Sequence, residues 1–242
     1  MAYAESDPYE LIPVAQAEVP RRVAFMRQVG IWTLGSLGIT AVAAALSMYA
    51  VVSVTFLQGR WTSMAVMLGG IYGAQFIGRF IAGTADRSTQ MMGFVAGSAA
   101  QGTALGYIML TAVMMSIEQY SQPFVFIGQA GALVAMTVLG MVAYLLTGPR
   151  NLSLLGSMMS MLTLPMLGLM AFSWFWPVGG VFGMILSLVF VGVSAAGLFY
   201  SLNNVMHRYS TEMVIPGAFQ VSIGIVVLFW NVLTLLMRLQ RR

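Results

Sequence analysis

The chain of 242 residues is 59% hydrophobic and only 7% charged, and apolar runs of about 18 residues or more recur along it. This composition excludes a soluble globular protein and predicts a multi-pass helical membrane protein. The net charge of +4 comes from arginines at the ends of apolar runs, which argues against a nucleic-acid-binding surface, and the lack of cysteine excludes disulfides and cysteine metal sites.

Residues 1–27 form the first unit of the predicted domain organisation. They combine prolines with charged residues of both signs and lack the apolar core of a secretory signal. Such a composition is typical of a flexible tail whose basic end lies next to the membrane. We therefore expect a flexible cytoplasmic tail over residues 1–27 and a transmembrane domain over residues 28–242.

Seven apolar segments are predicted to form transmembrane helices. Each can make about 30 Å of helix at about 1.5 Å per residue, and short polar breaks separate them. The segments span residues 29–56, 61–82, 90–116, 122–146, 152–174, 178–205 and 214–239. The expected fold class is an all-α integral membrane protein, a bundle of seven transmembrane helices.

The arginines indicate the orientation of this bundle. With the N-terminus in the cytoplasm, seven arginines fall inside and four outside, so the positive-inside rule favours this orientation. Three of the outside arginines lie at the C-terminus, and a re-entrant last segment would remove the conflict. Residues 215–237 are nevertheless uncharged and long enough to span, which favours seven crossings.

Small residues at helical spacing mark close packing. Helices approach closely in lipid through small side chains, and the second segment carries Gly69, Gly70, Gly73, Gly78 and Gly83. We interpret this pattern as internal packing, with oligomerisation as the alternative.

Two stretches carry a resemblance to a known family. Residues 144–156 read Tyr-Leu-Leu-Thr-Gly-Pro-Arg-Asn-Leu-Ser-Leu-Leu-Gly, and residues 200–205 read Tyr-Ser-Leu-Asn-Asn-Val. They resemble two motifs of the Bax inhibitor-1 family, the transmembrane Bax-inhibitor-motif proteins. The first resembles a helix junction in which Asn151 replaces an Asp, and the second resembles Tyr-Asp-x-Asn/Gln-x-Ile. Residues 218–236 resemble the closing helix of that family.

The resemblance implies a bundle whose last helix is central and a pH-sensitive calcium leak gated by two aspartates. Two facing carboxylates share a proton because both cannot ionise cheaply, so deprotonation can separate them. Matched residue by residue, the aspartates correspond to Ser201 and, by its distance from Ala218 and Phe229, to Gly224. Neither residue titrates, and residues 213–242 contain no Asp or Glu.

Other polar residues are candidates for a polar path or for helix contacts. Asn203 and Asn204 can offer carbonyl oxygens to a cation or can cap and bond their neighbours. Arg79 can latch an acid or extend to the interface, and His207 can sense pH or lie solvated at a helix end. Four amides are expected to join helices by hydrogen bonds: Gln75, Gln101, Gln129 and Asn231.

No enzyme, cofactor or metal site is predicted. The chain has one histidine, His207, and the acid nearest to it, Glu212, lies in a polar turn. The groups needed for serine hydrolysis, metal proteolysis or phosphate binding are therefore largely missing.

Two functions remain open from the sequence. The first is a scaffold or regulatory subunit of a membrane complex in the bacterial inner membrane, with the calcium leak lost. Bacterial members of the family resemble partners of membrane-bound proteases, so the expected partners are lipid and other integral membrane proteins. The second is a cation or calcium leak through Ser201, Asn203 and backbone oxygens, although calcium normally requires charged oxygen ligands.

Overall fold

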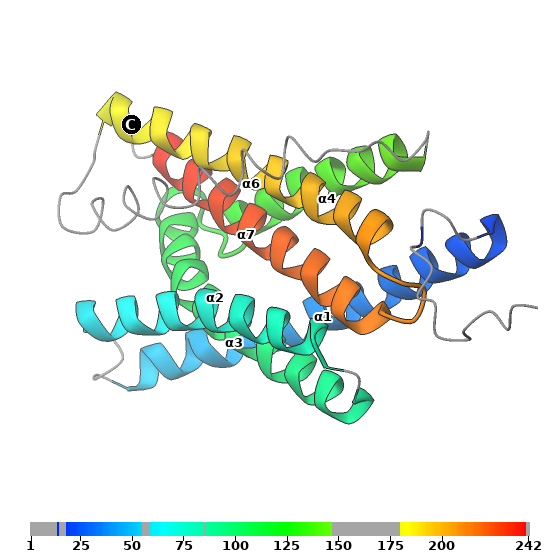
Figure 1. The fold of residues 1–242 in the computed structure, drawn as a ribbon. Coiled ribbons are helices and arrows are strands. Elements are labelled where there is room, and N and C mark those ends of the chain that lie inside the picture. The colour runs from blue at the N-terminus through cyan, green and yellow to red at the C-terminus, as the bar shows by residue number, and fades with distance from the viewer. Residues whose placement is uncertain (1–13, 15–17, 55–58, 85, 147–179, 241–242) are drawn as a thin grey trace, which may run out of the picture.

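The computed structural model describes residues 14, 18–54, 59–84, 86–146 and 180–240, and these residues are helical outside short turns. Within these residues, six helices are long and apolar enough to cross a membrane (Figure 1). They are α1 (Val19–Ser53), α2 (Arg60–Ala82), α3 (Arg87–Tyr120), α4 (Val125–Leu146), α6 (Gly180–Arg208) and α7 (Val214–Gln240). The predicted segment 152–174 lies outside the described residues, so an all-helical membrane fold is confirmed but the count of seven is not.

The first helix begins earlier than the predicted start near residue 29. Pro20 stands in the first turn of α1, where a missing backbone N–H costs nothing. Phe25 and Val29 are buried in the main hydrophobic core, which holds this end of the helix against the bundle. Residues 19–27, assigned to a flexible tail from their composition, are therefore helical, while residues 1–13 and 15–17 lie outside the described part.

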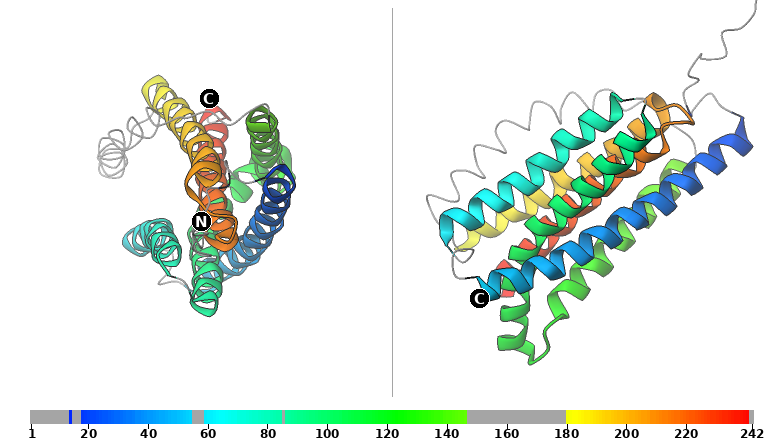
Figure 2. Two further views of the ribbon diagram at one scale, coloured as in Figure 1. Left: turned by 45° about the vertical axis from the view of Figure 1, so that its right-hand side comes forward. Right: turned by 90° about the horizontal axis from the view of Figure 1, so that it is seen from below.

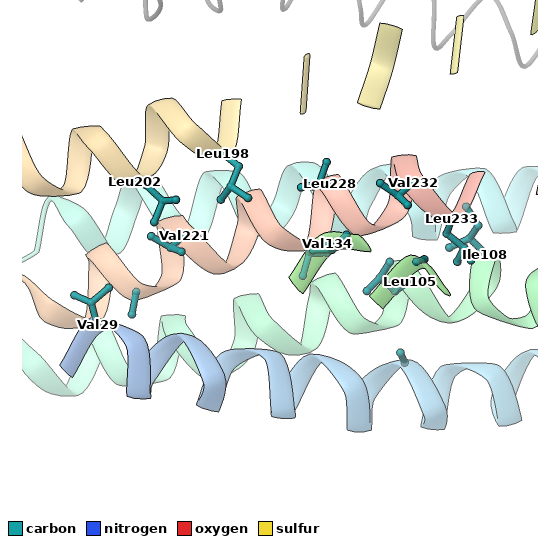
Figure 3. Close-up of a cluster of buried hydrophobic side chains, with 14 of the residues drawn as sticks. Val29, Leu105, Ile108, Val134, Leu198, Leu202, Val221, Leu228, Val232 and Leu233 are labelled. Carbon is teal, nitrogen blue, oxygen red and sulfur yellow. The ribbon is translucent and has the colours of Figure 1, made fainter. Parts of the chain in front are cut away.

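The last helix occupies the middle of the described bundle. α7 contacts each of the other five described helices, and its side chains form the centre of the main core together with residues of α3, α4 and α6 (Figure 3). The expectation of a central last helix holds for the helices that the structure describes.

One end of the bundle collects the start of α1, the end of α4 and the turn between α6 and α7 (Figures 1 and 2). The backbone N–H of Val14 donates a 3.0 Å hydrogen bond to the carbonyl of Tyr209 in that turn. The ring centroids of Tyr144 on α4 and Phe199 on α6 lie 5.6 Å apart. Hence α4 ends near the end of α6.

The opposite end holds the start of α6 and the ends of α3 and α7. Arg238 of α7 donates a 2.7 Å hydrogen bond to the carbonyl of Gly183 on α6. The Tyr120 hydroxyl of α3 donates to the side chain of Gln240 at 2.7 Å. α4 therefore ends, and α6 begins, at opposite ends of the bundle.

Polarity on α1 is the reverse of that on a helix at the surface of a soluble protein. Hydroxyl side chains face the protein interior: Thr33, Ser36, Thr40 and Ser47 are buried. Large apolar side chains face outward: Leu34, Val42 and Leu46 are exposed. Lipid solvates apolar side chains, whereas hydroxyls need partners from neighbouring helices, so the bilayer accounts for this arrangement.

Candidate functional site

The contact between α6 and α7 brings the neighbourhoods of Ser201 and Gly224 together. The two helices run antiparallel after the turn at residues 209–213, so residues late in α6 lie against residues early in α7. Ser201 is buried, and the amide of Gln220 donates a long hydrogen bond of 3.5 Å to its hydroxyl. The α7 side chain that reaches Ser201 is thus Gln220, one turn before Gly224.

Gly224 faces Leu198, which lies one turn before Ser201. A Cβ atom at position 224 would lie 2.8 Å from Cδ1 and 3.3 Å from Cα of Leu198. Leu198 is fully buried and points from α6 toward α7 (Figure 3). Glycine therefore permits the close approach of the two backbones here, and a larger side chain requires them to separate.

No carboxylate is available at this contact. Four acidic residues belong to the described part of the chain, and none lies on α6 or α7: Glu18, Asp86, Glu118 in the last turn of α3, and Glu212 in the turn between α6 and α7. The remaining three, Glu5, Asp7 and Glu10, precede residue 14. A proton-sharing pair of acids between α6 and α7 cannot form from the residues of this chain.

Asn203 is the most confined polar side chain of the α6 motif. It is 4% exposed, and its Oδ1 atom has no hydrogen-bond partner in the described structure. Its backbone carbonyl lies 2.9 Å from Nδ1 of His207, whose ring is half-buried. Asn204 is also half-buried. An unpaired buried amide oxygen is a free acceptor for a proton donor or a cation.

The remaining candidates lie apart from this contact. Arg79 is exposed in the last turn of α2. Two of the amides that were predicted to join helices do not do so within the described part of the chain. Gln101 is buried with both side-chain atoms unpartnered, and Asn231 donates to the carbonyl of Val227 on its own helix.

Hydroxyl side chains, which the sequence analysis did not single out, make the connections instead. Ser36 of α1 lies 2.7 Å from the hydroxyl of Ser98 on α3 and donates at 2.8 Å to that of Ser222 on α7. Thr33 donates at 3.3 Å to the carbonyl of Ala218, and Thr40 at 3.1 Å to that of Ser98. The sequence does contain a signal for this seam, because the hydroxyl residues of α1 recur at helical spacing in an otherwise apolar segment.

The described residues contain no group of three or more His, Cys, Asp or Glu side chains that could hold a metal ion. The polar groups near the α6–α7 contact are a hydroxyl, amides and one imidazole. They can donate and accept hydrogen bonds, but they provide no fixed negative charge for a divalent cation.

Long apolar helices around α7, with polar groups turned inward, define a multi-pass helical membrane protein. The sequence model of the family described as inhibitor of apoptosis-promoting Bax1 matches residues 22–242. The chain belongs to the Bax inhibitor-1 family, and the resemblance seen in its motifs is confirmed. This is not a known enzyme family. Comparisons with curated proteins and with solved structures find no match.

Proposed function

We propose that this protein is a non-enzymatic scaffold or regulatory subunit of a larger membrane complex and has lost the pH-switched calcium leak of its family. The observation that carries the proposal is the α6–α7 contact. Where two carboxylates would be needed, the chain supplies the hydroxyl of Ser201, the amide of Gln220 and a close leucine–glycine contact. None of these groups changes its charge with pH in the physiological range.

The packing at this contact also opposes ion passage. Leu198 fills the space in front of Gly224, and both Leu202 and Val221 are buried beside it in the same apolar core. A cation crossing such a region would lose its water without gaining charged ligands, which is costly in the membrane interior.

The outer face of α4 supports a role in binding other membrane proteins. Gly128, Ala132 and Ala135 are exposed on this helix, and no described atom lies within 4 Å of a Cβ built at Gly128. Small residues at a spacing of three or four allow a second transmembrane helix to approach closely. The partner that fits this face is another integral membrane protein.

The proposal places the protein in a bacterial inner membrane with seven crossings and a cytoplasmic N-terminus. The arginine distribution supports this orientation. The positions of the end of α4 and the start of α6, at opposite ends of the bundle, support an odd number of crossings.

A cation leak is the second candidate, and the unpartnered Oδ1 of Asn203 favours it. Together with the hydroxyl of Ser201, this oxygen could take part in a path that needs no acid. The two candidates differ in one measurable property, which is ion flux across a membrane that contains the purified protein.

Calcium flux into proteoliposomes at pH values between about 6 and 8 separates the candidates, because a carboxylate pair with a raised pKa would titrate in this range. We expect no flux above that of protein-free vesicles at any pH. Flux that disappears in Asn203→Ala but persists in the neighbouring control Asn204→Ala would establish the leak and overturn the loss of conduction.

Installing carboxylates tests the geometry of the contact. Ser201→Asp combined with Gln220→Asp places acids on two side chains that already touch, whereas Gly224→Asp must displace Leu198. We expect pH-dependent flux from the first pair. A gain from Ser201→Asp with Gly224→Asp alone would show that α6 and α7 pack differently from the structure.

Affinity purification at native abundance, followed by identification of neighbours, tests the subunit role. We expect a stable integral membrane partner that is lost in Ala132→Leu, because leucine keeps the helices apart, and retained in the matched control Ala45→Leu, which makes the same substitution at an exposed position of α1. Recovery of the protein without any partner would contradict the proposal.

A further inference from the structure

A groove of about 310 Å³ lies at the end of the bundle where α1 finishes and α2 begins. Among the described residues, α1 and α2 both pack on α3 without contacting each other (Figure 2), so α3 forms the floor between them. The lining includes Ala43, Ser47, Ala50, Val66, Thr103 and Tyr107. The groove is thus mostly apolar, with three hydroxyl groups.

Two of these three hydroxyls already have partners. Ser47 donates to the carbonyl of Thr103 at 2.9 Å, and Thr103 donates to that of Ala99 at 2.9 Å. The hydroxyl of Tyr107 is buried and has no partner in the described structure. A buried hydroxyl is normally satisfied, so Tyr107, which lines this groove, still lacks an acceptor.

The position of the groove along the helices indicates what that acceptor is. Its α1 residues lie in the last three turns of the helix, and Val66 lies in the second turn of α2. On the same part of α1, Tyr49 is 73% exposed, and exposed tyrosines concentrate at the level where hydrocarbon meets head groups. The groove therefore lies just inside the membrane interface.

The rim and the lining of the groove also suit the hydrocarbon chain of a lipid. Leu46 at the rim is 65% exposed, so the groove opens toward the hydrocarbon. Its volume is at the lower limit of small-molecule sites, which suits a stretch of acyl chain. The lining residues carry no formal charge and so provide nothing to bind a phosphate or a cation.

We propose that this groove binds one acyl chain of a glycerophospholipid and that the Tyr107 hydroxyl donates a hydrogen bond to the ester carbonyl of that chain. The groove lies just inside the membrane interface, which is the level of the ester groups of the lipid, and an ester carbonyl oxygen accepts a hydrogen bond without offering a competing donor. This site is separate from the α6–α7 contact and does not depend on the function proposed above.

The test uses the full-length protein in lipid nanodiscs that contain equal amounts of a diacyl ester phosphatidylcholine and its dialkyl ether analogue. The ether lipid has the same head group and chain length but no carbonyl. After mild detergent extraction, mass spectrometry measures which lipid stays bound. We expect the ester lipid to be retained over the ether lipid by about fivefold, the equivalent of one hydrogen bond.

Tyr107→Phe should abolish this preference, while the matched control Tyr49→Phe, with an exposed phenol on the same level, should keep it. Ala50→Leu, which fills the groove, should lower retention of both lipids, and this measurement applies even where Tyr107→Phe folds poorly. Equal retention of the two lipids by the wild-type protein, or an unchanged preference in Tyr107→Phe, overturns the proposal.

Discussion

Three serine hydroxyls meet where α1, α3 and α7 pack together. Ser36 contacts both Ser98 and Ser222, while those two also donate to carbonyls of their own helices at 2.7 Å and 2.9 Å. Four short contacts thus share three hydroxyl protons. Ser36 is the member that links helices, because its two partners belong to two different neighbours.

We expect Ser36→Ala to destabilise the bundle more than Ser222→Ala. The first substitution removes two contacts between helices, and the second removes one and leaves Ser36 bonded to Ser98. Hydrogen bonds between membrane helices contribute about 0.6 kcal/mol on average, so the expected losses in unfolding free energy are about 1 and about 0.5 kcal/mol. Unfolding in mixed micelles measures both.

The control for this comparison is Ser53→Ala, whose hydroxyl is exposed and bonds only within its own helix, to the carbonyl of Tyr49. It should change the unfolding free energy less than either core variant. Equal effects of Ser36→Ala and Ser53→Ala would show that the buried hydroxyls do not hold the three helices together.

At the α6–α7 contact, the sequence shows directly which residues are present but not which of them touch. Matching the motifs residue by residue placed Ser201 and Gly224 where the family has aspartates, and neither residue is an acid in any fold of the chain. The contact of Ser201 with Gln220, and of Gly224 with Leu198, depends on how α6 slides along α7. That register follows from the geometry of the intervening turn and from side-chain packing, which single-sequence motifs do not encode.

Among the elements, α3 shows best how its ends are fixed. Asp86 precedes the helix, and its carboxylate accepts hydrogen bonds from the backbone N–H groups of Ser88 and Thr89 and from the Thr89 hydroxyl. At the other end, Ser121 adopts a left-handed φ of 56° and donates its N–H to the carbonyl of Ile117. Both ends therefore satisfy backbone groups that the helix leaves open.

The Asp86 cap predicts a stability that depends on pH. The pKa of Asp86 is lowered from its ordinary 3.8, chiefly by the hydrogen bond from the Thr89 side chain and also by those from the backbone N–H groups. Because the folded state favours the carboxylate, the contribution is present above the unfolded pKa of 3.8 and is lost as the pH falls through the lower folded pKa. Acid should therefore weaken α3.

Thermal unfolding in detergent, followed from about pH 6 down to about pH 2.5, measures this effect. The unfolding midpoint of the wild-type protein should fall more steeply with acidification than that of Asp86→Asn, which keeps an acceptor but does not titrate. Glu118→Gln, which removes an acid at the far end of α3, should keep the wild-type slope. Identical slopes for the wild type and Asp86→Asn would contradict the role of the charged cap.

The six described helices were each predicted from the sequence, and one break between two of them carried its own chemistry. That break separates α2, which ends at Ala82, from α3, whose first turn is capped by Asp86. The start of α1 was predicted too late because the arginines near it mimic a solvated tail. Burial of Phe25 and Val29 against the bundle decides the boundary, and such tertiary contacts are not readable from local composition.

On the scale of the whole molecule, Val14, which precedes α1, is tied to the turn between α6 and α7. Val14 is fully buried within the main core cluster, and its N–H bonds to the carbonyl of Tyr209 between α6 and α7. The first helix is therefore held at its beginning by the turn that also sets the α6–α7 contact. Loosening one of these regions should loosen the other.

We expect Val14→Asp to release this anchor, because a carboxylate cannot remain in an apolar core without a partner. The first turns of α1 would then open more often, and trypsin would cleave after Arg21 at least about fivefold faster, the equivalent of about 1 kcal/mol of local stability. Digestion of the purified protein in nanodiscs, followed by mass spectrometry, gives the rate.

Val19→Asp is the matched control, since it introduces the same charge five positions later, where the valine is 66% exposed in the first turn of α1. An acid near a helix N-terminus interacts favourably with the helix dipole, so this variant should be cleaved no faster than the wild type. Equal acceleration in both variants would mean that negative charge near the cleavage site, and not loss of the Val14 anchor, controls the opening of α1.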